Sequence, residues 1–114
     1  MKLIIAVVKP NAVHRVKEEL NKAEVFRLTV IDCQGYGQQL GIKEQFRGQP
    51  FEVNLMRKVM LVIGVNENFV DPTIKAITAA AKSNGGSIGD GKIFVVDLEK
   101  CIRIRTGETG GEAI

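Results

Sequence analysis

The chain has 114 residues, of which 45% are hydrophobic and 25% charged, and its formal net charge is +3. This length fits one domain with a real core, and no apolar run approaches the ~18 residues of a membrane span, so we expect no direct membrane insertion. The modest positive charge suits anionic ligands but not nucleic acid. Cys33 and Cys101 lack metal or redox spacing, which favours free thiols in a reducing cytoplasm.

The first half of the chain predicts a strand, a helix and a second strand. Residues 3–8 are an apolar, β-branched strand, and Asn11 is the expected N-cap of the helix that follows. A second strand is expected over residues 27–36. The apolar stripe of the helix consists of Val13, Val16, Leu20 and Ala23.

The second half repeats this order. Residues 59–65 predict a strand, and Asp71-Pro72 predicts a helix start, with Asp71 as N-cap. Asn84-Gly85-Gly86 is expected to end that helix before a strand over residues 93–98. The buried face of the helix is expected to hold Ile74, Ile77 and Ala81. The βαββαβ order predicts a ferredoxin-like α+β fold, in which helices cover one sheet face and the other face favours an oligomer.

A long polar segment, residues 37–55, separates the second and third strands. It contains Gly41, Gly48 and Pro50 and is too long for a hairpin turn. Loops of this length are usually functional or disordered, so a partner-binding arm and a mobile insertion both remain open.

A glycine-rich stretch, residues 87–92, predicts a phosphate site because glycine amides can surround an anion. Lys92 adds a cation, and Arg103 and Arg105 would share one face of an extended segment, which suggests a single cationic pocket. The spacing also matches a Walker A motif, but Ile93 stands where that motif needs Ser or Thr, and a strand follows where it needs a helix. A plain tight turn is the alternative.

Several short motifs follow one another along the chain: Gly35-Tyr36-Gly37 with Gln39, Arg47-Gly48, Lys58-Val59, residues 88–95, residues 103–108 and the closing Ala113-Ile114. In this order and spacing, they make the chain resemble the PII nitrogen-regulatory signalling proteins of the GlnB/GlnK kind over essentially its whole length.

The resemblance implies a single PII-type domain, residues 1–114, that forms a homotrimer with ATP or ADP bound between subunits. Residues 37–55 match the family's T-loop, 82–92 its B-loop and 103–108 its C-loop. One subunit would supply the B-loop and its neighbour the C-loop arginines. The implied nucleotide contacts are Thr29, Gly37, Gln38, Gln39, Gly64, Gly89, Asp90, Gly91, Lys92, Arg103 and Arg105.

The resemblance also implies a second ligand and a signalling output. Gln39 would ligate Mg²⁺ beside ATP, and the metal would hold 2-oxoglutarate against Gln39, Leu40, Gly41 and Lys58. The T-loop, with Arg47 and Phe51, would bind partners according to the ligands present. Such partners are an ammonium transporter or a nitrogen-metabolism enzyme or regulator, which implies a cytoplasmic protein that an ammonium channel can bring to the membrane.

Several positions depart from the family pattern. Phe51 replaces the modifiable tyrosine, so no nucleotidylylation is expected there. Gln38, Leu40 and Val62 replace the usual arginine, lysine and glutamate, which affects nucleotide affinity. A slow ATP-hydrolysing enzyme or another small-ligand sensor on the same fold is the alternative, but no general base stands out, so we expect no enzyme.

Overall fold

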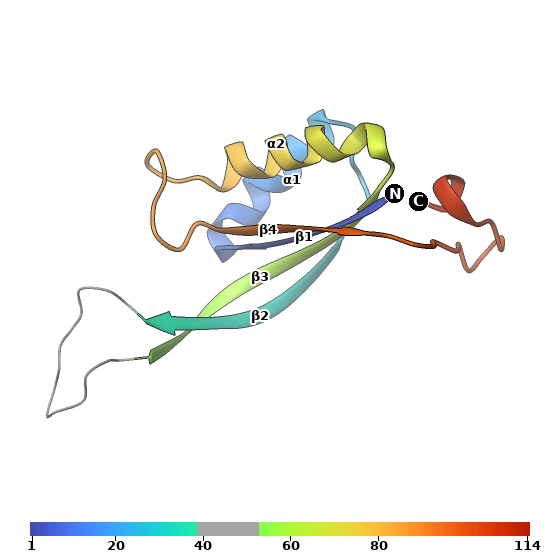
Figure 1. Cartoon of the computed structure of the whole chain (residues 1–114). Coiled ribbons are helices and arrows are strands. Elements are labelled where there is room, and N and C mark those ends of the chain that lie inside the picture. The colour runs from blue at the N-terminus through green and yellow to red at the C-terminus, as the bar shows by residue number, and fades with distance from the viewer. Residues whose placement is uncertain (39–52) are drawn as a thin grey trace, which may run out of the picture.

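Four strands form one antiparallel sheet in the order β2-β3-β1-β4. The computed structural model describes residues 1–38 and 53–114. The strands are β1 (Lys2–Val8), β2 (Thr29–Gln38), β3 (Val53–Val65) and β4 (Gly91–Asp97), and the helices are α1 (Val13–Lys22) and α2 (Val70–Ala81). Both helices lie on the same side of the sheet (Figure 1). The predicted ferredoxin-like α+β fold is therefore confirmed.

The core lies between the helices and one face of the sheet. Ile4 on β1, Leu61 on β3 and Leu20 on α1 are fully buried. The predicted stripe of α1 is confirmed, since Val16 and Leu20 are buried and Val13 and Ala23 pack against the core. On α2, Ile77 and Ala81 are buried as predicted, and Ile74 is partly buried against them.

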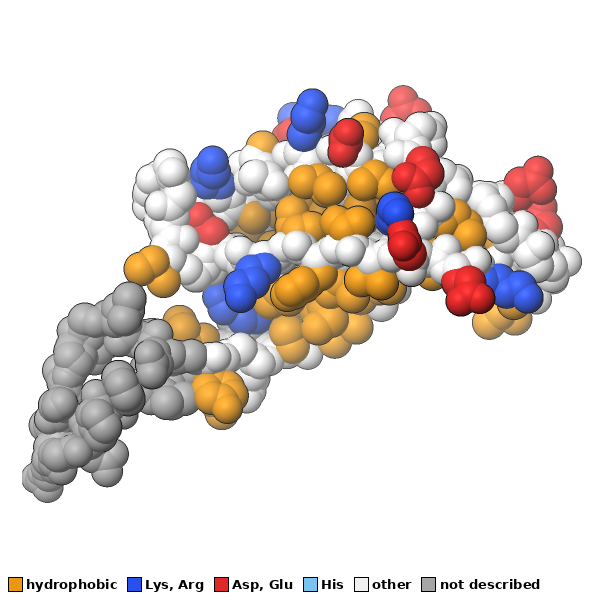
Figure 2. Space-filling view, in the orientation of Figure 1, with side chains coloured by type: hydrophobic (Ala, Val, Ile, Leu, Met, Phe, Trp, Pro, Cys, Tyr) orange, Lys and Arg blue, Asp and Glu red, His pale blue; other side chains and the backbone are white. Residues whose placement is uncertain are grey.

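No helix within residues 1–38 and 53–114 covers the opposite face of the sheet. Alternate residues of the strands point there, and Ile31, Phe94 and Val96 are 42%, 49% and 47% exposed. Figure 2 shows hydrophobic side chains gathered below β4, on the side away from the helices. A single chain thus leaves an apolar sheet face open, as the topology predicts.

Both helices begin differently from the prediction. Each is preceded by a 3-10 turn, η1 (Pro10–Ala12) or η2 (Glu67–Phe69). The chain is already helical where α1 and α2 begin, so Ala12 and Phe69 occupy the N-cap positions and make no side-chain cap. The predictions of Asn11 and Asp71 as N-caps are therefore wrong: the extended residues that start these helical segments are Lys9 and Asn66.

The boundaries of α2 and of the long segment also shift. The helix ends at Ala81 because Lys82 is extended (ψ 130°), and Asn84-Gly85-Gly86 forms the turn after it. β2 and β3 stay paired out to Gln38 and Val53, so five residues at the ends of the expected T-loop belong to the sheet. Backbone groups pair along such a ribbon whatever the side-chain polarity. Gln39, Leu40, Gly41, Arg47 and Phe51 lie outside the described residues.

Candidate functional site

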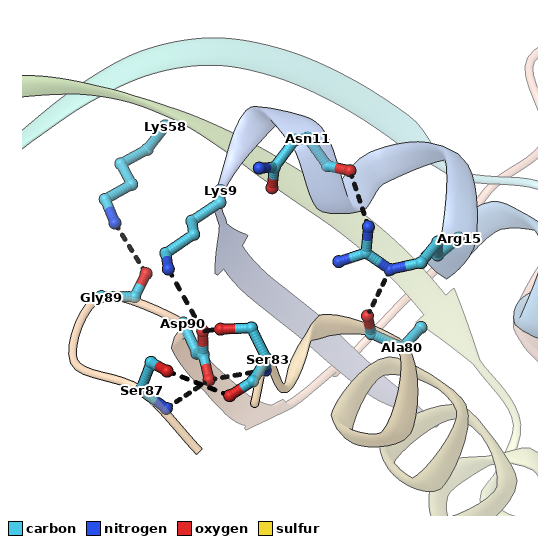
Figure 3. A network of polar contacts seen from close by, with 9 residues as sticks. All are labelled: Lys9, Asn11, Arg15, Lys58, Ala80, Ser83, Ser87, Gly89 and Asp90. Carbon is cyan, nitrogen blue, oxygen red and sulfur yellow. Dashed lines mark hydrogen bonds and ion pairs between the residues drawn. The ribbon is translucent and has the colours of Figure 1, made fainter. Parts of the chain in front are cut away.

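The carboxylate of Asp90 holds the B-loop together through hydrogen bonds. Asp90 Oδ2 accepts hydrogen bonds from the backbone N–H groups of Ser83 and Ser87 at 2.9 and 2.8 Å. Asp90 Oδ1 accepts one from Ser83 Oγ at 2.6 Å. Ser87 Oγ in turn donates to the Ser83 carbonyl oxygen at 3.0 Å, which completes the network in Figure 3. Two serines and one aspartate therefore fix the shape of the loop between α2 and β4.

These contacts keep Asp90 ionised. The hydrogen bonds from the Ser83 hydroxyl and from the Ser83 and Ser87 amides hold the pKa of the Asp90 carboxyl well below its ordinary value. Lys9 Nζ lies 3.4 Å from Asp90 Oδ1 and adds to this effect. An ionised carboxylate whose oxygens are already occupied is a poor general base, and its side chain would repel a phosphate.

Glycine is required where the loop meets the sheet. Gly91 has φ +121°, and a Cβ there would lie 1.9 Å from the Val7 carbonyl oxygen. Gly89 has φ +94° and faces Lys9 and Lys58. No side chain fits at Gly91, and the positive φ at both positions is a backbone conformation that glycine adopts without strain and that is common in anion-binding loops.

Lysines from three parts of the chain surround this loop. Lys58 Nζ donates to the Gly89 carbonyl oxygen at 2.9 Å, and Lys9 reaches Asp90 (Figure 3). Lys92 is exposed on β4 beside Val7. The predicted site includes Lys58 and Lys92 but not Lys9. Pairing of Val8 with Gly91 brings Lys9 to the loop, so only the sheet register could have revealed it.

The C-loop is a turn and not the predicted extended segment. The Gly107 N–H donates to the Arg103 carbonyl oxygen at 2.7 Å, and Arg105 lies within the turn over residues 104–106 and not on a strand. Arg103 donates to Glu108 Oε1 at 3.0 Å and to the Glu112 carbonyl oxygen at 3.1 Å. Arg105 is exposed and, among the described residues, has no such partner. The expectation of two arginines aligned on one strand face is therefore wrong.

The predicted site residues fall into two groups. We call Lys58, Gly89, Asp90, Gly91 and Lys92 the loop group, and Thr29, Gly64, Arg103 and Arg105 the arginine group. Lys58 and Gly64 lie six residues apart in β3, or about 20 Å. Figure 1 shows the loop after α2 and the C-terminal segment at opposite ends of the molecule. One chain therefore does not form the single cationic pocket that the residues alone suggested.

The arginine group borders a hollow of its own. Gly64 and Arg103 line a cavity of about 350 Å³ together with Val25, Phe26 and Phe69. Thr29 on β2 pairs with Val62 on β3, two residues before Gly64. Gly37 and Gln38 lie in the outer part of the β2–β3 ribbon, where they pair with Asn54 and Val53.

Comparison with known proteins identifies the class. The family model for "Nitrogen regulatory protein P-II" matches residues 1–108. The chain is 50% identical to nitrogen regulatory protein GlnK1 of Methanosarcina mazei over 114 residues, which are 100% of this chain and 97% of that one. It is 42% identical to nitrogen regulatory protein P-II of Rhizobium etli, with 100% of each chain covered.

Two solved structures share the fold. B. subtilis GlnK has a TM-score of 0.82 at 34% identity, covering 99% of this chain and 97% of that one. The B. subtilis GlnK–ATP complex has a TM-score of 0.82 at 32% identity, covering 99% and 94%.

The family model and these relatives are all named for nitrogen regulation, which is a signalling class. The chain belongs to the nitrogen regulatory protein P-II family. None of the helices in the described residues is long and apolar enough to cross a membrane. Residues 1–38 and 53–114 hold no cluster of three or more His, Cys, Asp or Glu side chains suited to a metal.

Proposed function

We propose that this chain reports nitrogen, carbon and energy status by binding ATP or ADP between the subunits of a homotrimer. The observation that carries the proposal is the separation of the loop group from the arginine group. Three copies joined by their open sheet faces would bring the loop group of one subunit to the arginine group of the next. The B. subtilis GlnK–ATP complex supports a nucleotide as the ligand.

The loop group and the arginine group would bind different parts of one nucleotide. Amides of Gly89 and Gly91 and the Lys92 ammonium would bind the phosphates, and Arg103 and Arg105 would close over them from the neighbour. Thr29 and Gly64 would line the adenosine, with Gly37 and Gln38 beside the phosphates. Asp90 would contribute by shaping the loop, because its carboxylate oxygens are occupied by Ser83 and Ser87.

A second ligand is proposed at the base of the T-loop. Phosphate oxygens and the amide oxygen of Gln39 would hold Mg²⁺, a hard cation that prefers oxygen ligands. The metal would supply a fixed positive charge for 2-oxoglutarate, with Gln39, Leu40, Gly41 and Lys58 around it. The Lys58 ammonium suits the distal carboxylate.

The output would be the conformation of the T-loop. Partners that bind one conformation would respond to the ratio of ATP to ADP and to 2-oxoglutarate. Arg47 and Phe51 would contact an ammonium transporter or a nitrogen-metabolism enzyme or regulator, and Phe51 would receive no nucleotidyl group. We place the protein in the cytoplasm, reaching the membrane only through such a channel.

Isothermal titration calorimetry tests this function. We expect the protein to bind ATP and ADP, and to bind 2-oxoglutarate only when Mg-ATP is present. Lys92→Ala should weaken ATP binding about tenfold or more, because one charged phosphate contact is lost. Lys75→Ala, on the exposed surface of α2, is the matched control and should bind normally. Binding of 2-oxoglutarate without nucleotide, or no binding of any adenine nucleotide, would contradict the proposal.

A further inference from the structure

We propose that Lys9 is a positioning residue of the B-loop, whose charge offsets that of Asp90 so that the loop can accept a polyphosphate. The inference rests on the proposed function, because it assumes that the B-loop binds nucleotide phosphates. It extends the site to a residue at the end of β1 that lies outside the predicted set.

A carboxylate stands at the centre of the proposed phosphate site. Asp90 lies between Gly89 and Gly91, and its side chain is only 17% exposed. Its oxygens accept the Ser83 and Ser87 hydrogen bonds, so the side chain cannot turn away without opening the loop. A fixed negative charge next to bound phosphates lowers their affinity unless a cation compensates for it.

Lys9 is placed to supply that cation. Its ammonium lies 3.4 Å from Asp90 Oδ1, and it forms the one ion pair that Asp90 makes within the described residues. Its backbone is held because the Ala12 N–H donates to the Lys9 carbonyl oxygen at 3.0 Å. Lys58, the other lysine beneath the loop, donates to the Gly89 carbonyl oxygen instead (Figure 3).

The hydrogen-bond pattern permits a clean removal of both charges. In Asp90→Asn, the amide oxygen can accept from the two backbone N–H groups, and the amide NH₂ can donate to Ser83 Oγ, since a hydroxyl both donates and accepts. The double variant Lys9→Met with Asp90→Asn therefore keeps the loop bonded while it removes the pair of opposite charges.

The experiment measures ATP, ADP and AMP affinity by calorimetry for the wild type, K9M, K9R, D90N, the double variant K9M/D90N and the surface control K75M. We expect K9M to weaken ATP roughly tenfold, ADP less and AMP least, because the uncompensated Asp90 charge acts on the phosphate charge. The double variant should return to within about threefold of the wild type, since both charges are gone. K9R and K75M should bind ATP as the wild type does.

Several results would overturn the inference. An equal loss for all three nucleotides would assign Lys9 to folding alone. No recovery in the double variant would show that Lys9 does not act by offsetting the Asp90 charge, which overturns the inference. Unchanged ATP binding in K9M would exclude a role for its charge. If circular dichroism shows that K9M does not fold, ATP affinity is compared among K9R, D90N and the double variant. A double variant that binds ATP far more weakly than K9R and D90N then overturns the inference. A wild type that binds no nucleotide would overturn the proposed function and this inference together, whereas normal wild-type binding without coupling between positions 9 and 90 overturns this inference alone.

Discussion

Gly91 is the residue at which the backbone leaves least room. Its φ of +121° and the 1.9 Å approach to the Val7 carbonyl oxygen both exclude a side chain. We expect Gly91→Ala to lower the free energy of unfolding by about 3 kcal/mol, through a left-handed backbone and a steric clash. Urea denaturation followed by circular dichroism measures this.

Gly85 provides the matched control for that change. It also has a positive φ, +76°, but a Cβ there meets nothing within 4 Å. Gly85→Ala should therefore cost only about 1 kcal/mol, the penalty of the backbone conformation alone. Equal costs at the two glycines would show that the close contact at Gly91 relaxes.

The charge of Asp90 makes a pH-dependent contribution to stability. Because the folded state lowers the pKa of this carboxyl, its contribution is complete at neutral pH and is lost as the pH falls below about 4 towards the folded-state pKa. By differential scanning calorimetry, we expect the melting temperature of the wild type to fall more steeply between about pH 5 and about pH 2 than that of Asp90→Asn. Parallel pH profiles would contradict the stabilising role of the ionised form.

At the scale of elements, Arg15 joins the two helices next to the B-loop. Arg15 of α1 donates from Nε to the Ala80 carbonyl oxygen of α2 at 3.1 Å, and from Nη1 to the Asn11 carbonyl oxygen at 3.1 Å (Figure 3). Arg15→Met should lower the free energy of unfolding by about 1 kcal/mol, because a carbonyl in the last turn of α2 loses its donor. Lys17→Met, an exposed change on the same helix, should have almost no effect in the same urea titration.

The elements show which parts of the fold the sequence determines. Apolar periodicity correctly predicts the strands and the buried stripes of α1 and α2, because burial dominates their placement. Asn11 and Asp71 mislead because 3-10 turns that carry no cap signature start the helical segments earlier. Lys9 reaches the site only through the pairing of Val8 with Gly91, a long-range register that no local pattern contains.

At the scale of the whole molecule, the proposed trimer would assemble through the open sheet face. Phe94 is 49% exposed on that face, so Phe94→Asp should place a charge where the proposed subunits meet. We expect a folded monomer by analytical ultracentrifugation that also fails to bind ATP, because no neighbour supplies Arg103 and Arg105. Ala79→Asp on the exposed surface of α2 should remain trimeric and bind ATP. A monomeric Phe94→Asp variant with normal ATP affinity would place the whole site in one chain.

Mixing two variants that are weakened on opposite sides of the proposed site tests the same arrangement directly. Lys92→Ala removes a charged phosphate contact from the loop side of every site, and Arg105→Ala removes one from the arginine side. The two variants are mixed in equal amounts, unfolded together and refolded as mixed trimers. Roughly one site in four should then be intact, because the loop must come by chance from the Arg105→Ala chain and the arginine from the Lys92→Ala chain. No recovery of ATP binding by calorimetry, with mixed trimers confirmed by native mass spectrometry, would contradict a shared site.

The pairing of β2 with β3 restricts how a signal can travel. Every residue from Thr29 to Gln38 faces a single partner, from Val62 to Val53, without an interruption. Sliding one strand past the other by one residue would turn Lys58 from the open face to the helix-covered face and bury its ammonium among apolar side chains. The register therefore opposes a lengthwise slip of the two strands, so a ligand bound at the base of the ribbon would have to act by bending or twisting it.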